Sequence, residues 1–303
     1  MSDAELEYTF ETPGGDITVS TTHIDRVMFP ADGITKREVI EYYHRVADFM
    51  LPELRDRALS MERFTKGIDV GGFFQKHVQK HYPEWIERAT LGAKTKVTYP
   101  ICNNAAALVY FANQGGVAFH IWTSRTATPN RPDLIVFDLD PPDGKFELAR
   151  EVAQRLHVEL DELELPSFVK TTGSKGLHVV VPTDGKASFE VVHALCGKVT
   201  ARMVAKHPDL VTSEFHKVDR KGRLYFDVMR NALGATFVAP YSLRGKPGAP
   251  ISAPITWKEL DDPKLRSDTF RLRDIRKRLD KTDPWAKLRA KPASIEAALA
   301  KGD

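Results

Sequence analysis

Cysteine is scarce in this chain, and its scarcity excludes several kinds of protein. Cys102 and Cys196 stand far apart and match no metal-ligand spacing. A disulfide-held secreted scaffold or a cysteine zinc site needs more cysteines in closer spacing. We therefore expect a protein of a reducing compartment.

Long hydrophobic runs and an excess of one charge are also missing. No run approaches the ~20 apolar residues that cross a bilayer, and the acidic N-terminus lacks the apolar core of a signal peptide. Lysine and arginine number 44 against 41 aspartates and glutamates, which gives a formal net charge of +3. This balance permits a polyanionic partner without requiring one. We expect a cytoplasmic protein without a membrane partner.

The pattern of apolar and polar residues predicts a mixed fold of helices and strands. The 303 residues suffice for a sizeable core. Residues 34–54 predict a helix that begins with a Thr35–Glu38 capping box, and residues 83–89 predict a short one. A polar loop with prolines, residues 124–133, is the best internal boundary. Residues 271–292 are strongly basic and predict a helix, which on its own would be a solvated surface helix.

Beyond the boundary loop, the predicted elements follow a recognisable order. Strands and helices alternate as β-α-β-β-α-β, which is the ferredoxin-like or RNA-recognition-like arrangement. The predicted strands are 134–137, 167–170, 177–181 and 223–227, the helices are 147–163 and 189–206, and a further strand covers 235–240.

Two aspartates end the first of these strands. In the stretch "LIVFDLD", Asp138 and Asp140 are two residues apart and therefore face the same way on a strand. Two carboxylates this close cannot both stay ionised cheaply, and a divalent cation such as Mg²⁺ or Mn²⁺ resolves the conflict. A structural alternative is that one aspartate caps the next turn while the other is solvated.

A third aspartate strengthens the metal hypothesis. "RLYFDVMRN" alternates as a strand and places Asp227 at its end, and this strand can lie beside that of Asp138. Three carboxylates on adjacent strands could hold two metals roughly 3.5–4 Å apart, as in in-line phosphoryl displacement.

Two further stretches predict phosphate binding. In "KTTGSKGLHVVVP", the glycines let the backbone approach an anion and free its N–H groups, while Ser174 and Lys175 add a hydroxyl and a charge. In "APYSLRG", Ser242 and Arg244 follow a strand, and the arginine could clamp a triphosphate. Each stretch alone could equally be a surface turn.

Taken together, "FDLDP", "TGSKGLHVVVP" and "APYSLRG" resemble the archaeo-eukaryotic primase superfamily, and more closely the polymerase domain of bacterial ligase D and its stand-alone relatives. The resemblance runs from about Ile24 to Leu265. It implies an α+β primase-polymerase fold over residues 1–303. An N-terminal α/β module (about 1–125) would pack on the RNA-recognition-like catalytic module (about 126–265), with a basic helical C-terminal segment (about 266–303).

The resemblance also implies roles for individual residues. Asp138, Asp140 and Asp227 would bind metal and carry catalysis. The incoming nucleotide would be held by His120, Ser174, Lys175, His178, Ser242 and Arg244. Arg26 and Lys36 would grip the 5′-phosphate of a downstream DNA strand, and the template would contact Arg63, Phe73, Phe74, Lys217, Arg220 and Lys221.

Some of these residues have a plainer interpretation, and two positions depart from the family pattern. On a strand, Phe73 and Phe74 face opposite ways, so at least one is expected in the core, and His120 could be a core histidine. Arg26 stands where relatives often have lysine, which keeps the charge. Glu62 stands where a basic residue often lies.

The activity implied is template-directed gap filling at DNA breaks during non-homologous end joining, with a preference for ribonucleotides. Two ions, Mn²⁺ or Mg²⁺, would serve a nucleotidyltransferase that uses nucleoside triphosphates and gapped or broken double-stranded DNA with a 5′-phosphate. Separate ligase, nuclease and Ku-like end-binding proteins would be its partners.

Two alternatives from other classes stay open. "LIVFDLD" also resembles the first strand of haloacid-dehalogenase-type phosphatases, although Pro141 and Pro142 replace that family's following residues. A non-catalytic module that binds 5′-phosphorylated DNA ends would need only Arg26, Lys36 and the basic tail, and would leave the three aspartates unused.

Overall fold

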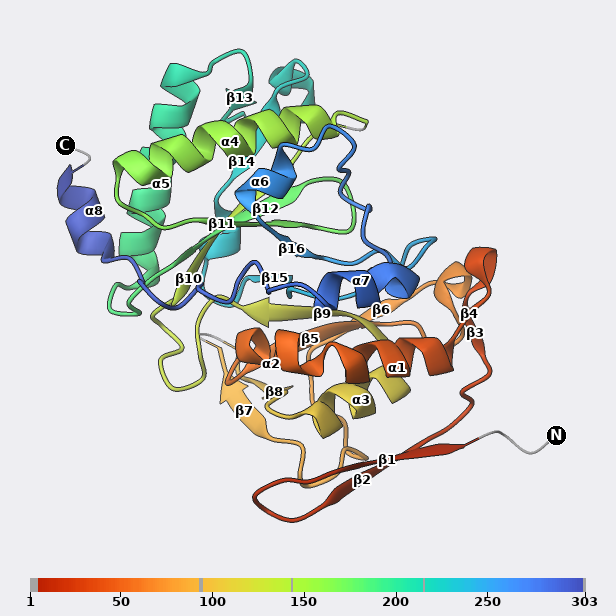
Figure 1. The fold of residues 1–303 in the computed structure, drawn as a ribbon. Coiled ribbons are helices and arrows are strands. Elements are labelled where there is room, and N and C mark those ends of the chain that lie inside the picture. Colours follow the sequence, from red (N-terminus) through yellow and green to blue (C-terminus); the bar gives the residue numbers. More distant parts are fainter. Residues whose placement is uncertain (1–4, 93–94, 143, 215, 302–303) are drawn as a thin grey trace. The chain divides into compact units, whose positions relative to one another are not determined.

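The computed structural model describes residues 5–92, 95–142, 144–214 and 216–301. The chain divides into two compact units, each built from more than one stretch of sequence (Figure 1). The first unit takes residues 1–121, 238–251 and 270–281, and the second takes 122–237, 252–269 and 282–303. The contiguous modules expected from the sequence stay a prediction.

The described part of the first unit contains a sheet and four helices. In its sheet β5 lies between β9 and β6, and both neighbours run antiparallel to it. Its strands are β1 (Leu6–Phe10), β2 (Ile17–Thr21), β3 (Val27–Phe29), β4 (Ile34–Thr35), β5 (Leu59–Arg63), β6 (Phe73–Gln75), β7 (Arg88–Leu91), β8 (Val97–Pro100) and β9 (Gly116–Trp122). Its helices are α1 (Lys36–Arg45), α2 (Ala47–Leu54), α3 (Ala105–Asn113) and the short α7 (Ile275–Leu279).

The second unit contains the β-α-β-β-α-β arrangement expected from the sequence. Its sheet has the strand order β13-β14-β10-β12-β11-β16, and Figure 1 shows α4 and α5 on the same side of it. The strands are β10 (Leu134–Asp140), β11 (Phe168–Thr171), β12 (Leu177–Pro182), β13 (Val211–Thr212), β14 (Leu224–Asp227) and β16 (Pro254–Ile255), and the helices are α4 (Phe146–Glu162), α5 (Phe189–Lys206), α6 (Trp257–Leu260) and α8 (Ile295–Lys301). Strand β15 (Thr236–Val238) lies in the chain where the second unit gives way to the first.

Local sequence explains how these helices begin. The capping box of α1 forms as predicted: the Thr35 side chain accepts a hydrogen bond from the Glu38 amide, and the Glu38 side chain accepts one from the Thr35 amide. Asn104 caps α3 and Ser188 caps α5 in the same way, each accepting from the third residue of its helix. Such caps satisfy backbone donors that the first helical turn leaves unpaired.

The predicted helix 34–54 is two helices, and the predicted helix 83–89 is absent. α1 ends and α2 begins at Val46, which is fully buried, so packing sets this break.

Residues 81–86 form turns, closed by a hydrogen bond from the Ile86 amide to the Pro83 carbonyl. So short a segment gains too few helical hydrogen bonds to offset the cost of the first turn.

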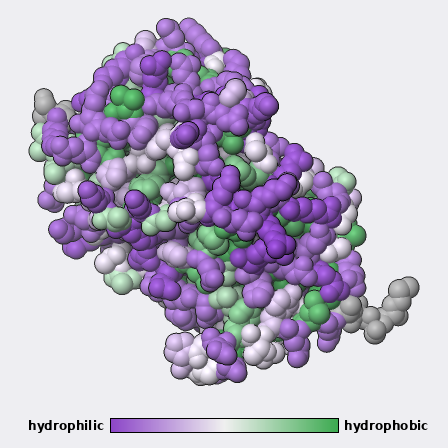
Figure 2. Space-filling model, viewed as in Figure 1, coloured by the Kyte–Doolittle hydropathy of each residue, from purple (hydrophilic) through white to green (hydrophobic). Residues whose placement is uncertain are grey.

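The basic C-terminal segment is helical only in part, which corrects the prediction for residues 271–292. Within it the chain forms α7 and then turns before α8 begins at Ile295. Pro284 and Pro292 lack the amide donor that a continuous helix needs. Hydrophilic side chains cover the surface over α7 (Figure 2). Among the described helices, none is long and apolar enough to span a membrane.

Candidate functional site

Four titratable side chains form a row across the second unit's sheet. Lys170 on β11 lies opposite His178 on β12, His178 lies opposite Asp138 on β10, and Asp138 lies opposite Asp227 on β14. Residues directly opposite each other share a sheet face, and Asp140 shares it because it lies two residues beyond Asp138. The sheet register thus places all three predicted metal ligands on one face.

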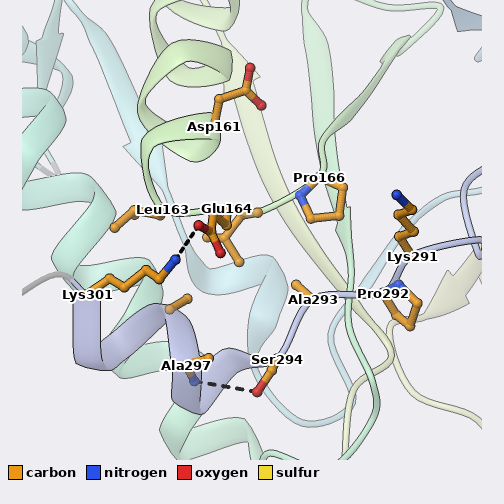
Figure 3. Close-up of a pocket in the computed structure, with 12 residues that line it drawn as sticks. Asp161, Leu163, Glu164, Pro166, Lys291, Pro292, Ala293, Ser294, Ala297 and Lys301 are labelled. Atoms are coloured by element: carbon orange, nitrogen blue, oxygen red, sulfur yellow. Dashed lines mark hydrogen bonds and ion pairs between the residues drawn. The ribbon is translucent and has the colours of Figure 1, made fainter.

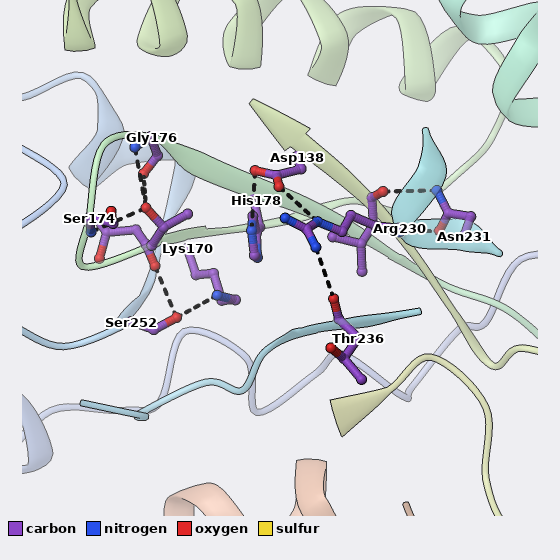
Figure 4. A network of polar contacts seen from close by, with 12 residues as sticks. Asp138, Lys170, Ser174, Gly176, His178, Arg230, Asn231, Thr236 and Ser252 are labelled. Carbon is purple, nitrogen blue, oxygen red and sulfur yellow. Dashed lines mark hydrogen bonds and ion pairs between the residues drawn. The ribbon is translucent and has the colours of Figure 1, made fainter. Parts of the chain in front are cut away.

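Asp138 is more enclosed than Asp140, which is exposed. Its side chain is 13% exposed; its Oδ1 lies 3.4 Å from His178 Nε2, and its Oδ2 accepts a hydrogen bond from Arg230 Nε at 3.0 Å (Figure 4). Burial by itself would raise the pKa of Asp138, but His178 and Arg230 together hold that pKa well below its usual range. Asp138 is therefore ionised at neutral pH.

His178 is neutral at the same pH. Burial, aided by the charge of Lys170, lowers the pKa of His178 to about 4 despite the nearby Asp138. The contact with Asp138 is thus one between a carboxylate and a neutral imidazole. Among the described residues, the buried Nδ1 atom of His178 meets no hydrogen-bond partner.

Lys170 and Arg230 join this site although the sequence did not single them out. Lys170 is fully buried, and its Nζ donates to Ser252 Oγ at 2.5 Å. Arg230 follows Asp227 by three residues, in the turn after β14. The signal for Lys170 was its place on a strand facing that of His178, but only the register reveals that the two residues are opposite.

The oxygen ligands of the three aspartates and the placement of their backbones on one sheet face fit a divalent cation. Their side chains, however, do not converge on one point. The described residues contain no group of three or more His, Cys, Asp or Glu side chains arranged to hold a metal. Asp138 is turned to His178 and Arg230, and Asp227 Oδ1 accepts a hydrogen bond from the Met229 amide at 2.8 Å. What the three carboxylates share is the sheet face.

The loop between β11 and β12 is organised by Thr172. Its Oγ1 accepts hydrogen bonds from the amides of Ser174 at 3.3 Å and Gly176 at 3.2 Å. This corrects the expectation that the glycines free these amides for an anion. Gly176 is required for a different reason: a Cβ there would lie 1.9 Å from the carbonyl oxygen of Leu139. The loop therefore packs tightly on β10, beside Asp140.

Ser174 and Lys175 line a recess of about 280 Å³. Two further basic residues, Lys145 and Arg266, line the same recess, and Ser267 Oγ donates to the Ser174 carbonyl at 2.7 Å. Side chains rather than loop amides would therefore hold an anion here.

Three basic residues meet in a pocket of the first unit. Arg26, Lys36 and Arg63 line a cavity of about 210 Å³. Lys36 Nζ donates to the Thr22 carbonyl at 2.6 Å, and Arg26 Nη1 donates to the Thr65 carbonyl at 2.6 Å. Burial, with a contribution from Arg26, lowers the pKa of Lys36 to about 8. The structure thus groups Arg63, expected at the template, with the two residues expected at a 5′-phosphate.

Phe73 and Phe74 are both exposed, at 49% and 58%, so the prediction that at least one lies in the core is wrong. β6 is an edge strand, which leaves these side chains uncovered. The Arg63 guanidinium lies 5.5 Å from the Phe73 ring centroid, and the Phe74 ring lies edge-on to His120 at 5.2 Å. The exposed rings suit stacking on bases.

Ser242 and Arg244 differ in their surroundings. Ser242 is fully buried; its Oγ accepts from the Phe119 amide at 2.8 Å and donates to the Leu243 carbonyl at 3.1 Å. These hydrogen bonds indicate a structural role for Ser242: they fix the segment that carries Arg244. The Arg244 amide donates to the Pro250 carbonyl at 2.8 Å, and its side chain is half-buried.

The predicted template loop leads into β14. The backbone of Lys217 begins a 3₁₀ turn, Lys217–Arg220, and its side chain lies outside the described structure. The Arg220 guanidinium lies 4.3 Å from the ring centroid of Tyr225, which is opposite Asp140. Lys221 is exposed in a left-handed conformation with a φ of 50°.

Another pocket, of about 470 Å³, lies where the chain leaves α4 and where α8 begins (Figure 3). Leu163, Pro166 and Ala297 are among its apolar lining residues, and Lys301 forms an ion pair with Glu164 at its rim. None of the predicted site residues that the structure describes lines this pocket.

Comparisons with known proteins identify the family. The family model "LigD, primase-polymerase domain" matches residues 35–285. The multifunctional non-homologous end joining DNA repair protein LigD of Mycobacterium tuberculosis is 36% identical over 287 residues, covering 88% of this chain and 38% of the relative. LigD of Mycolicibacterium smegmatis is 34% identical over 286 residues, covering 93% and 37%. The chain thus spans less than two fifths of these relatives.

A solved structure agrees with the sequence matches. The polymerase domain of Mycobacterium tuberculosis ligase D, in complex with DNA, superposes with a TM-score of 0.85 and 34% identity, covering 91% of this chain and 99% of that one. This match confirms the mixed α+β primase-polymerase fold, and the family resemblance found in the sequence is confirmed with it. The chain belongs to the LigD primase-polymerase domain family, whose members are metal-dependent nucleotidyltransferases.

Proposed function

We propose that this protein is a template-directed primase-polymerase that fills short gaps at DNA breaks during non-homologous end joining, with a preference for ribonucleotides. The observation that carries the proposal is the strand register, which places Asp138, Asp140 and Asp227 on one sheet face beside the Ser174–Lys175 loop. The family match supports it over the phosphatase alternative.

The side chains of the second unit have distinct parts in this proposal. Asp138, Asp140 and Asp227 would hold two Mn²⁺ or Mg²⁺ ions, which when bound lower the pKa of an attacking 3′-hydroxyl and offset phosphate charge. Ser174 and Lys175 bind the triphosphate from the recess that they line. Neutral His178 orients Asp138 through Nε2, and its Nδ1 can accept a hydrogen bond from the nucleotide.

The first unit supplies groups for DNA and for the nucleotide. Arg26 and Lys36 bind the 5′-phosphate of the downstream strand in their shared pocket, and Arg63 adds charge there. The exposed Phe73 and Phe74 stack on template bases. Arg244 and His120 contact the nucleotide. In the second unit, the template strand is contacted by Lys217, Arg220 and Lys221. Separate ligase, nuclease and Ku-like proteins complete the repair.

The test is primer extension on DNA with a short gap and a 5′-phosphorylated downstream strand. Wild type, supplied with Mn²⁺ and ribonucleoside triphosphates, should extend the primer by templated addition. Asp140→Ala should lower kcat/KM on the order of a thousandfold, because it removes several kcal/mol of transition-state charge stabilisation. Asp140 is exposed, so urea unfolding of the variant should match wild type.

Three other outcomes would weigh against the proposal or part of it. Extension that is indifferent to the 5′-phosphate would remove the gap-filling role. Equal use of deoxyribonucleotides would remove the ribonucleotide preference. No extension with any nucleotide, together with retained binding to phosphorylated ends, would favour the non-catalytic end-binding module.

A further inference from the structure

Arg230 occupies a place that the proposed function does not explain. Its Nε donates to Asp138 Oδ2 at 3.0 Å, and its Nη1 donates to the Thr236 carbonyl at 3.4 Å. Figure 4 shows its side chain directed from the turn after β14 back to Asp138. The Arg230 side chain is 46% exposed, whereas that of Asp138 is 13% exposed. A half-exposed cation thus covers a nearly buried carboxylate.

The turn that carries Arg230 is firmly anchored to β10. Asn231 is 1% exposed, and its side chain pairs with both backbone groups of Val136, accepting from the amide at 2.8 Å and donating to the carbonyl at 2.9 Å. The Met229 amide donates to Asp227 Oδ1 at 2.8 Å. Because the backbone on both sides of Arg230 is fixed, the guanidinium can reach Asp138 without further ordering of the chain.

A divalent cation and the Arg230 guanidinium compete for Asp138 Oδ2. A cation bound to this oxygen would lie within a few ångströms of the guanidinium, whose Nε donates to the same oxygen. Two cations so close repel strongly in a partly buried site. The three carboxylates on this face also repel one another when no cation is present, so the arginine relieves the same charge that a metal would.

We propose that the Arg230 guanidinium neutralises Asp138 in the metal-free protein, and that metal binding displaces the guanidinium from Asp138. The inference rests on the proposed function, which assigns Asp138 to the metal. The Arg230–Asp138 pair orders the buried carboxylate before a metal arrives. The same ion pair weakens the apparent affinity of the site for the metal, by about tenfold if the pair is formed roughly 90% of the time.

The test compares wild type with Arg230→Gln by two readouts that do not involve activity. Titration calorimetry with Mn²⁺ alone should show about tenfold tighter binding by the variant. In EDTA the variant should have a lower Tm than wild type, because Asp138 loses its partner. In saturating Mn²⁺ this difference in Tm should close, because the metal takes over the role of the guanidinium.

Arg202→Gln is the matched control. Arg202 also pairs with a buried acidic side chain, Glu159, and with the half-exposed Glu162, but it does so between α4 and α5. Its substitution should leave Mn²⁺ affinity unchanged and should lower the Tm equally with and without metal. This pattern is what a purely structural ion pair produces.

The outcomes separate the inference from the proposed function. If Arg230→Gln binds Mn²⁺ with wild-type affinity, or if its Tm deficit persists in saturating Mn²⁺, Arg230 is structural and the inference fails while the metal site stands. If wild type neither binds Mn²⁺ nor gains Tm from it, the proposed metal site fails, and the inference fails with it.

Discussion

His178 shows how one residue's surroundings decide its chemistry. Burial, together with Lys170, lowers its pKa to about 4 from the ordinary 6.5, so it is neutral at pH 7. A neutral imidazole can donate to Asp138 from one nitrogen and accept from a ligand at the other. The sequence supplies the histidine, and the strand register supplies the carboxylate and the lysine that fix its state.

The depressed pKa of His178 predicts a pH-dependent stability in the metal-free protein. Between pH 6.5 and about 4 the unfolded chain binds a proton at His178 that the folded protein does not, so stability falls as pH falls. The cost reaches about 3 kcal/mol at pH 4.

Urea unfolding in EDTA should therefore show that the stability of wild type relative to His178→Gln declines from pH 7 toward pH 4. A difference that stays constant over this range would contradict the prediction. Asp138 adds to the same trend only at lower pH, because its folded pKa lies below that of an ordinary aspartate and its contribution is lost below pH 4.

At the scale of elements, the β11–β12 loop and β10 act as one piece. Gly176 permits a backbone approach to Leu139 that no side chain could tolerate, and Thr172 and Ser267 hold the rest of the loop. The loop that carries Ser174 and Lys175 is thereby fixed against the strand that carries Asp138 and Asp140. Strand pairing, rather than a flexible loop, sets the spacing between the carboxylates and the predicted phosphate ligands.

Gly176→Ala should lower the free energy of unfolding by about 1–3 kcal/mol, because the added methyl group forces the loop away from β10. Gly197→Ala is the matched control. Gly197 lies within α5, and a Cβ there would meet nothing within 4 Å, so alanine should stabilise the protein by roughly 0.5–1 kcal/mol. Urea unfolding measures both, and a Gly176→Ala variant as stable as wild type would show that the loop can yield.

For the whole molecule, the formal net charge of +3 is small, so any affinity for DNA must come from local groups. Arg26, Lys36 and Arg63 gather in one pocket, although they are separated in the sequence. The lowered pKa of Lys36, about 8, means that this charge is present at pH 7 and lost as pH rises through 8 unless a bound phosphate retains the proton.

Lys36→Met should weaken binding to gapped DNA with a 5′-phosphate and leave binding to the 5′-hydroxyl form nearly unchanged. The slope of log K against log salt should fall in magnitude by about 1, the value for one lost phosphate contact. Fluorescence anisotropy at several salt concentrations measures both quantities. An equal loss of affinity for the two DNA forms would place Lys36 away from the 5′-phosphate.

The sequence by itself determined what local patterns can encode. The helices α1, α4 and α5, the β-α-β-β-α-β order and the pairing of Asp138 with Asp140 on one face follow from periodicity, caps and strand alternation. The motif set also determined the family. Where local signals were short or broken, at residues 83–89 and 271–292, the helix prediction failed because prolines and tertiary contacts outweigh propensity.

Only the tertiary structure decided which distant residues meet. The opposition of Lys170, His178, Asp138 and Asp227 depends on strand order and register, which no single segment encodes. The exposure of both Phe73 and Phe74 depends on β6 being an edge strand. The Arg230–Asp138 pair depends on a turn held by Asn231 against β10. Charge and burial at these positions are properties of the assembled sheet, because they arise from neighbours that are far away in the chain.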